Sequence, residues 1–153
     1  HIVDFFENYK HKDKILYVCP RDMTGSDKRR WIKNKVPTNK PYKIETHPSP
    51  IGAAHFVLHK NWINTVGYFL PPQFWHWHID NWLTKIAVRL GRAYVLPHVQ
   101  IQSKKMIDDH TGKRIRKEMN IINRDLDVWK RTRDRYLTAD VEALQKFIKD
   151  YKG

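Results

Sequence analysis

The stretch from residue 80 to residue 101 constrains the fold most, because an amphipathic helical pattern leads directly into β-favouring segments. Apolar residues recur there at helical spacing: Trp82, Leu83, Ile86, Ala87 and Leu90. Asp80 stands where the N-cap of this helix is expected, and Gly91 ends the pattern. RAYVLP and VQIQ follow as two short strands on either side of Pro97. Helix and strand patterns in one compact segment predict an α/β fold, with a mixed sheet and flanking helices.

The rest of the chain gives further elements of the same kind. KILYVCP predicts a buried strand stopped by Pro20, and residues 34–52 predict a long loop because they hold four prolines without a sustained period. A short strand at residues 55–58 precedes a brief helix that ends at Gly67. Two helices follow, and they predict a helical C-terminal extension. The first carries the stripe Ile115, Met119, Ile122, Leu126 and Trp129; the second starts at Thr138, ends at Gly153 and buries Val141, Leu144, Phe147, Ile148 and Tyr151.

Length and composition predict one domain over residues 1–153. We divide it into a basic N-terminal strand and loop at 1–49, a core at 50–103 and charged helices at 104–153. The lone Cys19 cannot pair within the chain. No apolar run reaches the roughly 18 residues of a membrane span, and no signal peptide is recognisable, so we expect a cytoplasmic protein. Because the sequence opens on His1 and not on methionine, we expect either a processed product, or a trimmed form, or the C-terminal part of a longer chain.

A net charge of +13 predicts an anionic partner: a nucleotide diphosphate, nucleic acid or an acidic surface. The excess is concentrated in residues 8–43 and 104–136. A solvated face explains both basic stretches equally well. The composition therefore indicates the sign of the partner's charge and leaves its class open.

The sequence FWHWHID raises one catalytic hypothesis. If this segment were a strand, His76 and His78 would point to one face and could chelate a divalent metal. The pair resembles the histidines of HUH nucleases, in which a helical tyrosine attacks a DNA phosphate, so Tyr136 or Tyr151 would be the nucleophile. The alternative is that aromatic residues before a helix pack in the core. The preceding Pro-Pro pair favours that alternative because proline disfavours a paired strand.

A wider window, residues 50–103, resembles the acceptor-side, C-terminal half of GT-A fold glycosyltransferases, particularly the small bacterial and phage-type enzymes. In that family an apolar strand, a helix ending in Gly-Tyr or Gly-Phe, a loop ending in aspartate, a D-x-W-L helix and a short strand follow in order. The matching pieces are residues 55–58, Gly67-Tyr68-Phe69, Asp80, Trp82-Leu83, Gly91-Arg92 and residues 94–97. A weaker similarity continues through Thr111-Gly112-Lys113.

The resemblance implies a function: transfer of a sugar from a nucleotide-sugar donor to a glycan or other hydroxyl acceptor. In inverting members the aspartate at this position is the general base, and this implies that role for Asp80. Trp75, Trp77 and His78 would then form a platform for the acceptor, since sugars stack on aromatic rings. The alternatives are that Asp80 only caps the helix and that at least one of these tryptophans packs in the core.

Departures from the family pattern affect the donor site. The family pairs two aspartates to hold a divalent metal, Mg or Mn, on the donor diphosphate, whereas this chain offers only Asp22, flanked by Arg21. The histidine expected after the last strand is also absent, and Lys104 and Lys105 stand near its place. Three explanations remain open: the missing acids lie upstream, the two lysines neutralise the diphosphate without metal, or the domain is catalytically silent.

The competing class is a basic nucleic-acid-binding module. Basic runs at residues 28–35 and 131–135 are interleaved with Trp31, Trp129 and Tyr136. This composition suits phosphate contacts combined with base stacking. No known nucleic-acid-binding motif accompanies these runs, so the hypothesis depends on charge and aromatic content alone.

Overall fold

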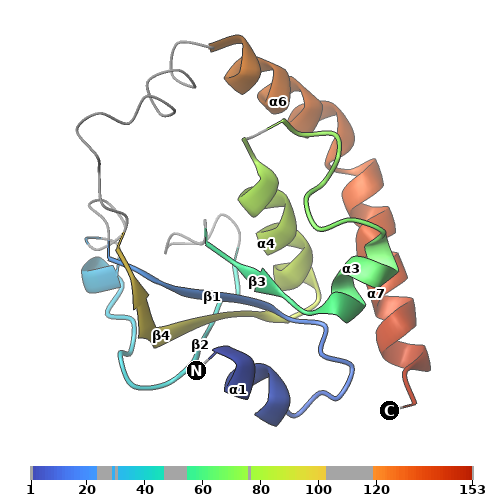
Figure 1. Ribbon diagram of the computed structural model, residues 1–153. Helices are drawn as coiled ribbons and strands as arrows, with labels where there is room; N and C mark the ends of the chain where they lie inside the picture. Colours follow the sequence, from blue (N-terminus) through green and yellow to red (C-terminus); the bar gives the residue numbers. More distant parts are fainter. Residues whose placement is uncertain are drawn as a thin grey trace.

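The chain forms an α/β fold with a mixed four-stranded sheet and helices on both of its faces (Figure 1). The computed structural model describes residues 2–23, 29, 31–46, 55–75, 77–102 and 119–152, without the side chains of 119 and 120. The elements in chain order are α1 (Ile2–Asn8), β1 (Tyr17–Asp22), β2 (Tyr42–Lys43), β3 (Val57–Leu58), α3 (Lys60–Val66), α4 (Ile79–Arg89), β4 (Ala93–Ile101), α6 (Met119–Thr132) and α7 (Arg135–Asp150). The predicted fold class is confirmed.

The sheet has the order β2-β4-β1-β3, and its two central strands, β1 and β4, run parallel. Both outer strands are antiparallel to their neighbours. The predicted end of the first strand at Pro20 is wrong, because β1 continues to Asp22. The register passes from Pro20 opposite Leu96 to Arg21 opposite Gln100, so β4 contains a bulge at this point.

The same bulge explains why β4 is one strand where the sequence predicts two. Pro97 lies inside the irregular stretch between Leu96 and Gln100, where the regular pairing with β1 is interrupted. Proline has no N–H to donate to a neighbouring strand, and a bulge is a position in a sheet that tolerates this loss. The strand therefore passes through the proline without ending.

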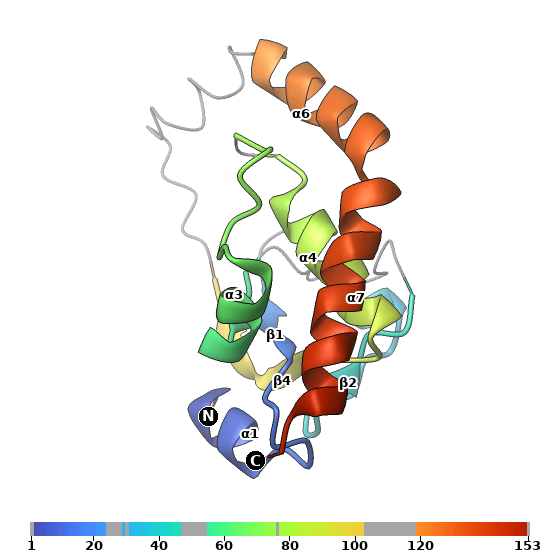
Figure 2. The ribbon, with the colours of Figure 1, turned by 90° about the vertical axis from the view of Figure 1, so that its right-hand side faces the viewer.

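The sheet separates two hydrophobic layers. Helices α3, α4 and α7 cover one face, and α1 covers the other (Figures 1 and 2). In β1, Tyr17 and Cys19 belong to the larger core beneath the three helices, whereas Val18 and the preceding Leu16 pack with Phe6 of α1. Alternating side chains of one strand thus serve both layers. The pattern of the N-terminal segment did not predict α1, and β2 lies within the long loop predicted for residues 34–52.

The C-terminal part is helical, as the sequence predicts. The long helix α7 packs along α3 and α4 and buries Leu137, Val141 and Leu144 (Figure 2). It begins at Arg135 and not at Thr138. Tyr151 is exposed, contrary to expectation, because α7 ends at Asp150 and Tyr151 is its C-cap, outside the buried stripe of the helix. Within the described ranges, no helix has the length and apolar character needed to cross a membrane.

Candidate functional site

The carboxyl ends of β1 and β4 lie at one edge of the sheet, where Asp22 pairs with Ile101. Because α4 runs back antiparallel to β4, its N-terminus returns to the same edge, and antiparallel β3 starts there too (Figure 1). Ligands of open α/β sheets characteristically bind beyond the carboxyl ends of parallel strands. The topology therefore gathers the end of β1, the start of β3 and the start of α4 around one place.

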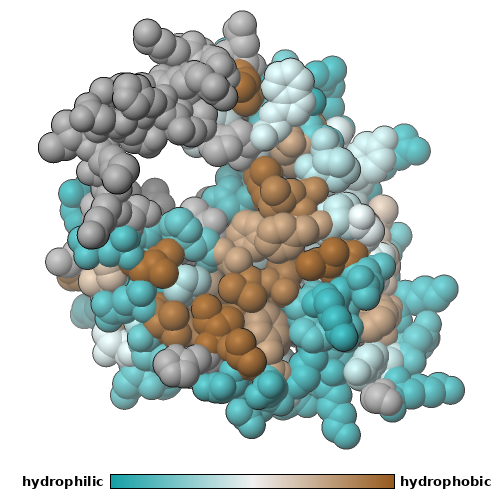
Figure 3. Space-filling model, viewed as in Figure 1, coloured by the Kyte–Doolittle hydropathy of each residue, from teal (hydrophilic) through white to brown (hydrophobic). Residues whose placement is uncertain are grey.

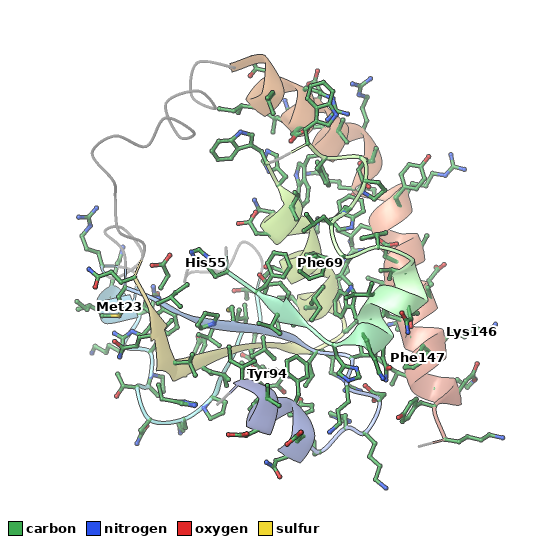
Figure 4. All side chains as sticks on the ribbon, viewed as in Figure 1. Met23, His55, Phe69, Tyr94, Lys146 and Phe147 are labelled. Atoms are coloured by element: carbon green, nitrogen blue, oxygen red, sulfur yellow. The ribbon has the colours of Figure 1, made fainter. Side chains whose placement is uncertain are left out.

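A cavity of about 470 Å³ occupies this place. Its lining combines aromatic, aliphatic, imidazole and carboxylate groups: His55, Phe56, Leu70, Trp77, His78, Ile79 and Asp80. Figure 4 shows His55 at the start of β3 and Phe69 on the same side of that strand. Phe69 extends the apolar surface, with its ring 5.6 Å from that of Phe56. Hydrophobic residues gather at the centre of this face of the molecule (Figure 3).

Asp22 contacts His55, which lines the cavity. The imidazole Nε2 of His55 lies 3.4 Å from Oδ2 of Asp22. Asp22 is buried at the end of β1, while the His55 side chain is 46% exposed. Arg21, which flanks Asp22 and was predicted with it, Lys104 and Lys105 to contact the donor, has its guanidinium carbon 5.1 Å from the ring centroid of Trp31. Asp22 is thus beside the cavity, and Arg21 stacks on an aromatic residue of the core.

Asp80 occupies the first turn of α4 and lines the cavity. Its predicted position as N-cap is wrong: α4 starts at Ile79, and His78 is the N-cap, with a left-handed backbone at φ 66° and no capping bond from its side chain. Near a helix N-terminus the unpaired backbone N–H groups and the helix dipole stabilise a carboxylate. The Asp80 carboxylate therefore lies at the N-terminal end of the α4 dipole and faces the cavity.

The buried hydroxyl of Tyr17 interacts electrostatically with Asp80. Burial raises the pKa of the Tyr17 hydroxyl well above its ordinary value, with smaller contributions from Cys19 and from the charge of Asp80, while a hydrogen bond with Thr84 opposes the shift. The hydroxyl therefore stays protonated at physiological pH. The sequence indicated a buried strand at Tyr17 but gave no sign that its side chain lies close to Asp80.

The loop that carries the predicted acceptor residues is held by Asp125 of α6. This fully buried carboxylate accepts the backbone N–H of Trp75 with both oxygens at 3.1 Å, and the N–H of Trp77 at 2.8 Å. Nη1 of Arg124 donates to the same carboxylate at 2.7 Å. Charge-assisted bonds to a buried carboxylate are strong. Sequence reasoning missed Asp125, because an acid on a highly charged helix is usually solvated.

The imidazole of His78 stacks on the indole of Trp129, with centroids 5.5 Å apart. Trp129 also packs against Trp82, and the ammonium of Lys85 lies 5.6 Å from its ring centroid. This contact from α6 supports the unusual left-handed conformation of His78, since strained backbone persists where the surroundings fix it. The C-terminal helices thus form part of the site.

Neither predicted acceptor tryptophan is buried in the core. Trp75 is 64% exposed and Trp77 is 37% exposed. Phe74 and Trp82 pack in the core nearby, with rings 5.5 Å apart. The expectation that at least one of the two acceptor tryptophans packs in the core is therefore wrong. The loop directs Phe74 inward and leaves its neighbours at the surface.

Several predicted site residues lie outside the described residues, namely His76, Lys104 and Lys105. Trp77 and His78 form a bend before α4 and not a strand, so the alternation that would align two histidines has no support in the described part of the motif. The two candidate tyrosine nucleophiles, Tyr136 and Tyr151, are exposed near opposite ends of α7.

The described residues do not complete a metal site. Among them, no group of three or more His, Cys, Asp or Glu side chains could hold a metal ion. Asp22 and His55 supply two potential ligands, and magnesium on a diphosphate prefers several oxygen ligands. The expected Mg or Mn site at Asp22 therefore stays a prediction.

We compared the chain with models of known protein families, with curated proteins and with solved structures, and none of the three comparisons gives a match.

Proposed function

We propose that this chain is a GT-A-like glycosyltransferase domain that transfers a sugar from a nucleotide-sugar donor to a hydroxyl of an acceptor bound in the cavity at Asp80. One observation carries the proposal: the Asp80 carboxylate lines a cavity shared with Trp77 and His78, at the carboxyl edge of the two parallel strands. A carboxylate in a concave site beside aromatic rings suits the activation and stacking of a sugar hydroxyl.

In the proposed reaction, Asp80 takes the proton of the acceptor hydroxyl as its oxygen attacks the anomeric carbon of the donor sugar. The bond from that carbon to the diphosphate breaks, the leaving nucleotide diphosphate takes the electron pair, and the configuration inverts. A neutral hydroxyl is a weak nucleophile, so a base within hydrogen-bonding reach is required. Phe56, Leu70 and Trp77 supply apolar surface for the faces of the sugar.

The donor would lie toward Asp22 and His55, on the strand-end side of the cavity. Lys104 and Lys105 follow β4 in sequence, and in this proposal they neutralise the diphosphate. A divalent metal, Mg or Mn, would supply the same neutralisation when bound. Activity should therefore be assayed with and without added Mg or Mn.

The test is Asp80→Asn, assayed against a panel of UDP-, GDP- and CDP-sugars. Asparagine has nearly the same shape but cannot accept the proton, so turnover should fall by a factor on the order of 10² or more. The donor-induced rise in melting temperature should persist, since it reports binding to the native state. Asp127→Asn, on the exposed side of α6, is the matched control and should keep full turnover. Full activity of Asp80→Asn would remove the assignment of the base.

Nucleic-acid binding is the second candidate, and one observation favours it. Tyr136 is exposed near the start of α7, and the guanidinium of Arg135 lies 5.6 Å from its ring centroid, beside the basic run 131–135. Such a group could contact phosphates and stack on a base. Binding of single-stranded DNA that persists at high salt, with no response to nucleotide sugars, would favour this class, because purely electrostatic binding weakens with salt.

A further inference from the structure

We propose that Trp75 and Arg124 form an outer sugar-binding subsite next to the cavity, and that the acceptor is therefore an oligosaccharide. The inference rests on the proposed function and specifies its acceptor. Trp75 is not among the residues that line the cavity, yet its neighbour Trp77 is. The two residues are separated by one position, so their Cα atoms are within about 7 Å of each other. In this proposal one glycan chain extends from the cavity at Trp77 to the indole of Trp75.

The exposure of Trp75 is the first observation. Trp75 is 64% exposed, although folding normally covers most of a large apolar side chain such as tryptophan. Trp77, 37% exposed, adjoins it on the same loop. Large apolar side chains left exposed on a loop that borders a cavity are typical of a binding surface.

The fixed geometry of Trp75 is the second observation. Its backbone N–H is bound by the buried carboxylate of Asp125, and the guanidinium carbon of Arg124 lies 4.0 Å from its ring centroid. Arg124 is in turn fixed by bonds from Nη1 to Asp125 and, at 3.2 Å, to the carbonyl of Gln73. A ring held in place before binding loses little conformational freedom when a ligand stacks on it.

The pairing of an indole with a guanidinium suits a sugar. The ring face that the Arg124 guanidinium does not cover offers an apolar surface to the C–H face of a pyranose. The side chain of Arg124 is 34% exposed, and its N–H groups are donors for a sugar hydroxyl. Asp125 is the positioning residue of this subsite, because it orients both tryptophans without being exposed itself.

The experiment compares acceptors of different length with Trp75→Ala, Trp75→Phe and Trp77→Ala. Glucose- and N-acetylglucosamine-based monosaccharides, and their tri- and tetrasaccharides, serve as acceptors. Trp75→Ala should raise the KM for tri- and tetrasaccharides at least about fivefold, as expected for the loss of one stacking contact. It should leave the KM for monosaccharides and for the donor unchanged. Trp75→Phe keeps an aromatic ring and should raise the KM for tri- and tetrasaccharides less than Trp75→Ala does. Trp77→Ala alters the cavity and should change the KM for every acceptor.

A binding measurement without donor separates the two proposals. If no donor is turned over but tetrasaccharides bind to the wild type and not to Trp75→Ala, the proposed function fails and the subsite stands. If turnover occurs and Trp75→Ala changes no KM, or changes the KM of short and long acceptors by the same factor, the outer subsite is overturned. Binding of single-stranded DNA that is lost in Trp75→Ala, without any oligosaccharide binding, also overturns it and assigns Trp75 to base stacking.

Discussion

The imidazole Nε2 of His55 lies 3.4 Å from Oδ2 of Asp22, so a residue two positions before β3 contacts the last residue of β1. These residues are far apart in the sequence and meet because β3 runs antiparallel to β1. His55 lines the cavity that contains Asp80, whereas Asp22 is buried behind it. The contact thus links the strand end, where the donor is proposed to bind, to the wall of the acceptor cavity.

His55→Gln tests whether this link serves a ligand or the fold. The His55 side chain is 46% exposed, and glutamine can still donate a hydrogen bond to the buried carboxylate of Asp22, so the free energy of unfolding should fall by no more than about 1 kcal/mol. Turnover should fall, because the side chain lines the proposed reaction cavity. The matched control is His98→Gln, an exposed histidine of β4 outside the cavity lining. Equal turnover of wild type and His55→Gln would exclude a role for His55.

The sequence was sufficient to predict those helices and helix ends that depend on local patterns. The helical spacing from Trp82 to Leu90 predicted α4, and Gly67, at φ 84°, ends α3 as expected of a glycine in the left-handed region. The continuation of β1 and β4 through their prolines was not predictable. It depends on a bulge that appears only when the two strands pair.

In the candidate site, too, the sequence predicted what neighbouring residues determine and not what contacts between distant segments determine. Asp80, Trp77 and His78 were predicted to lie together, and they line one cavity. The roles of His78 and Asp125 were not visible in the sequence, because both depend on contacts between α6 and the loop before α4. Long-range contacts of this kind leave no periodic signal in either segment.

The reactivity of Cys19 gives a test of the core. Its thiol is fully buried in β1, and burial raises its pKa well above the ordinary value for cysteine. The thiolate is the reactive form, so Cys19 should react with a thiol reagent such as DTNB only when the protein unfolds. The measurement compares the rate of reaction in buffer and in concentrated urea. Rapid reaction of the native protein would show that β1 is not covered on both faces.

A buried ion pair provides a test of stability. Arg92 donates from Nη1 and Nη2 to the two carboxylate oxygens of Asp13, each at 3.3 Å, and both residues are buried. Asp13→Asn leaves the guanidinium without its counter-charge, so the variant should lose about 3–5 kcal/mol of unfolding free energy. Urea denaturation measures this loss.

The control is an exposed pair on the same chain. Arg133 and Asp134 lie 3.6 Å apart with both side chains exposed, so Asp134→Asn should cost less than about 1 kcal/mol. Similar losses in Asp13→Asn and Asp134→Asn would contradict the assignment of Asp13 and Arg92 to the interior.

The last prediction concerns Asp140 of α7. Trp82 Nε1 donates to its Oδ2 at 3.0 Å, and the Tyr68 hydroxyl donates to the same oxygen. Burial nevertheless raises the pKa of this carboxyl, and outweighs the two hydrogen bonds that lower it. The folded state therefore holds the proton more tightly than the unfolded state. Linkage then requires stability to fall as the pH rises from about 4, the value for an unfolded aspartate, through the raised pKa.

Asp140→Asn removes this titration, because an amide stays neutral while its oxygen can still accept from Trp82 and Tyr68. The free energy of unfolding of the variant, relative to wild type, should increase as the pH is raised from about 4 to about 7. Glu142→Gln, which removes one exposed negative charge from the same helix, should show no such trend. Urea denaturation at several pH values gives both differences. If the difference between Asp140→Asn and wild type were independent of pH, or fell as the pH rises, the carboxyl would not have a raised pKa in the folded protein.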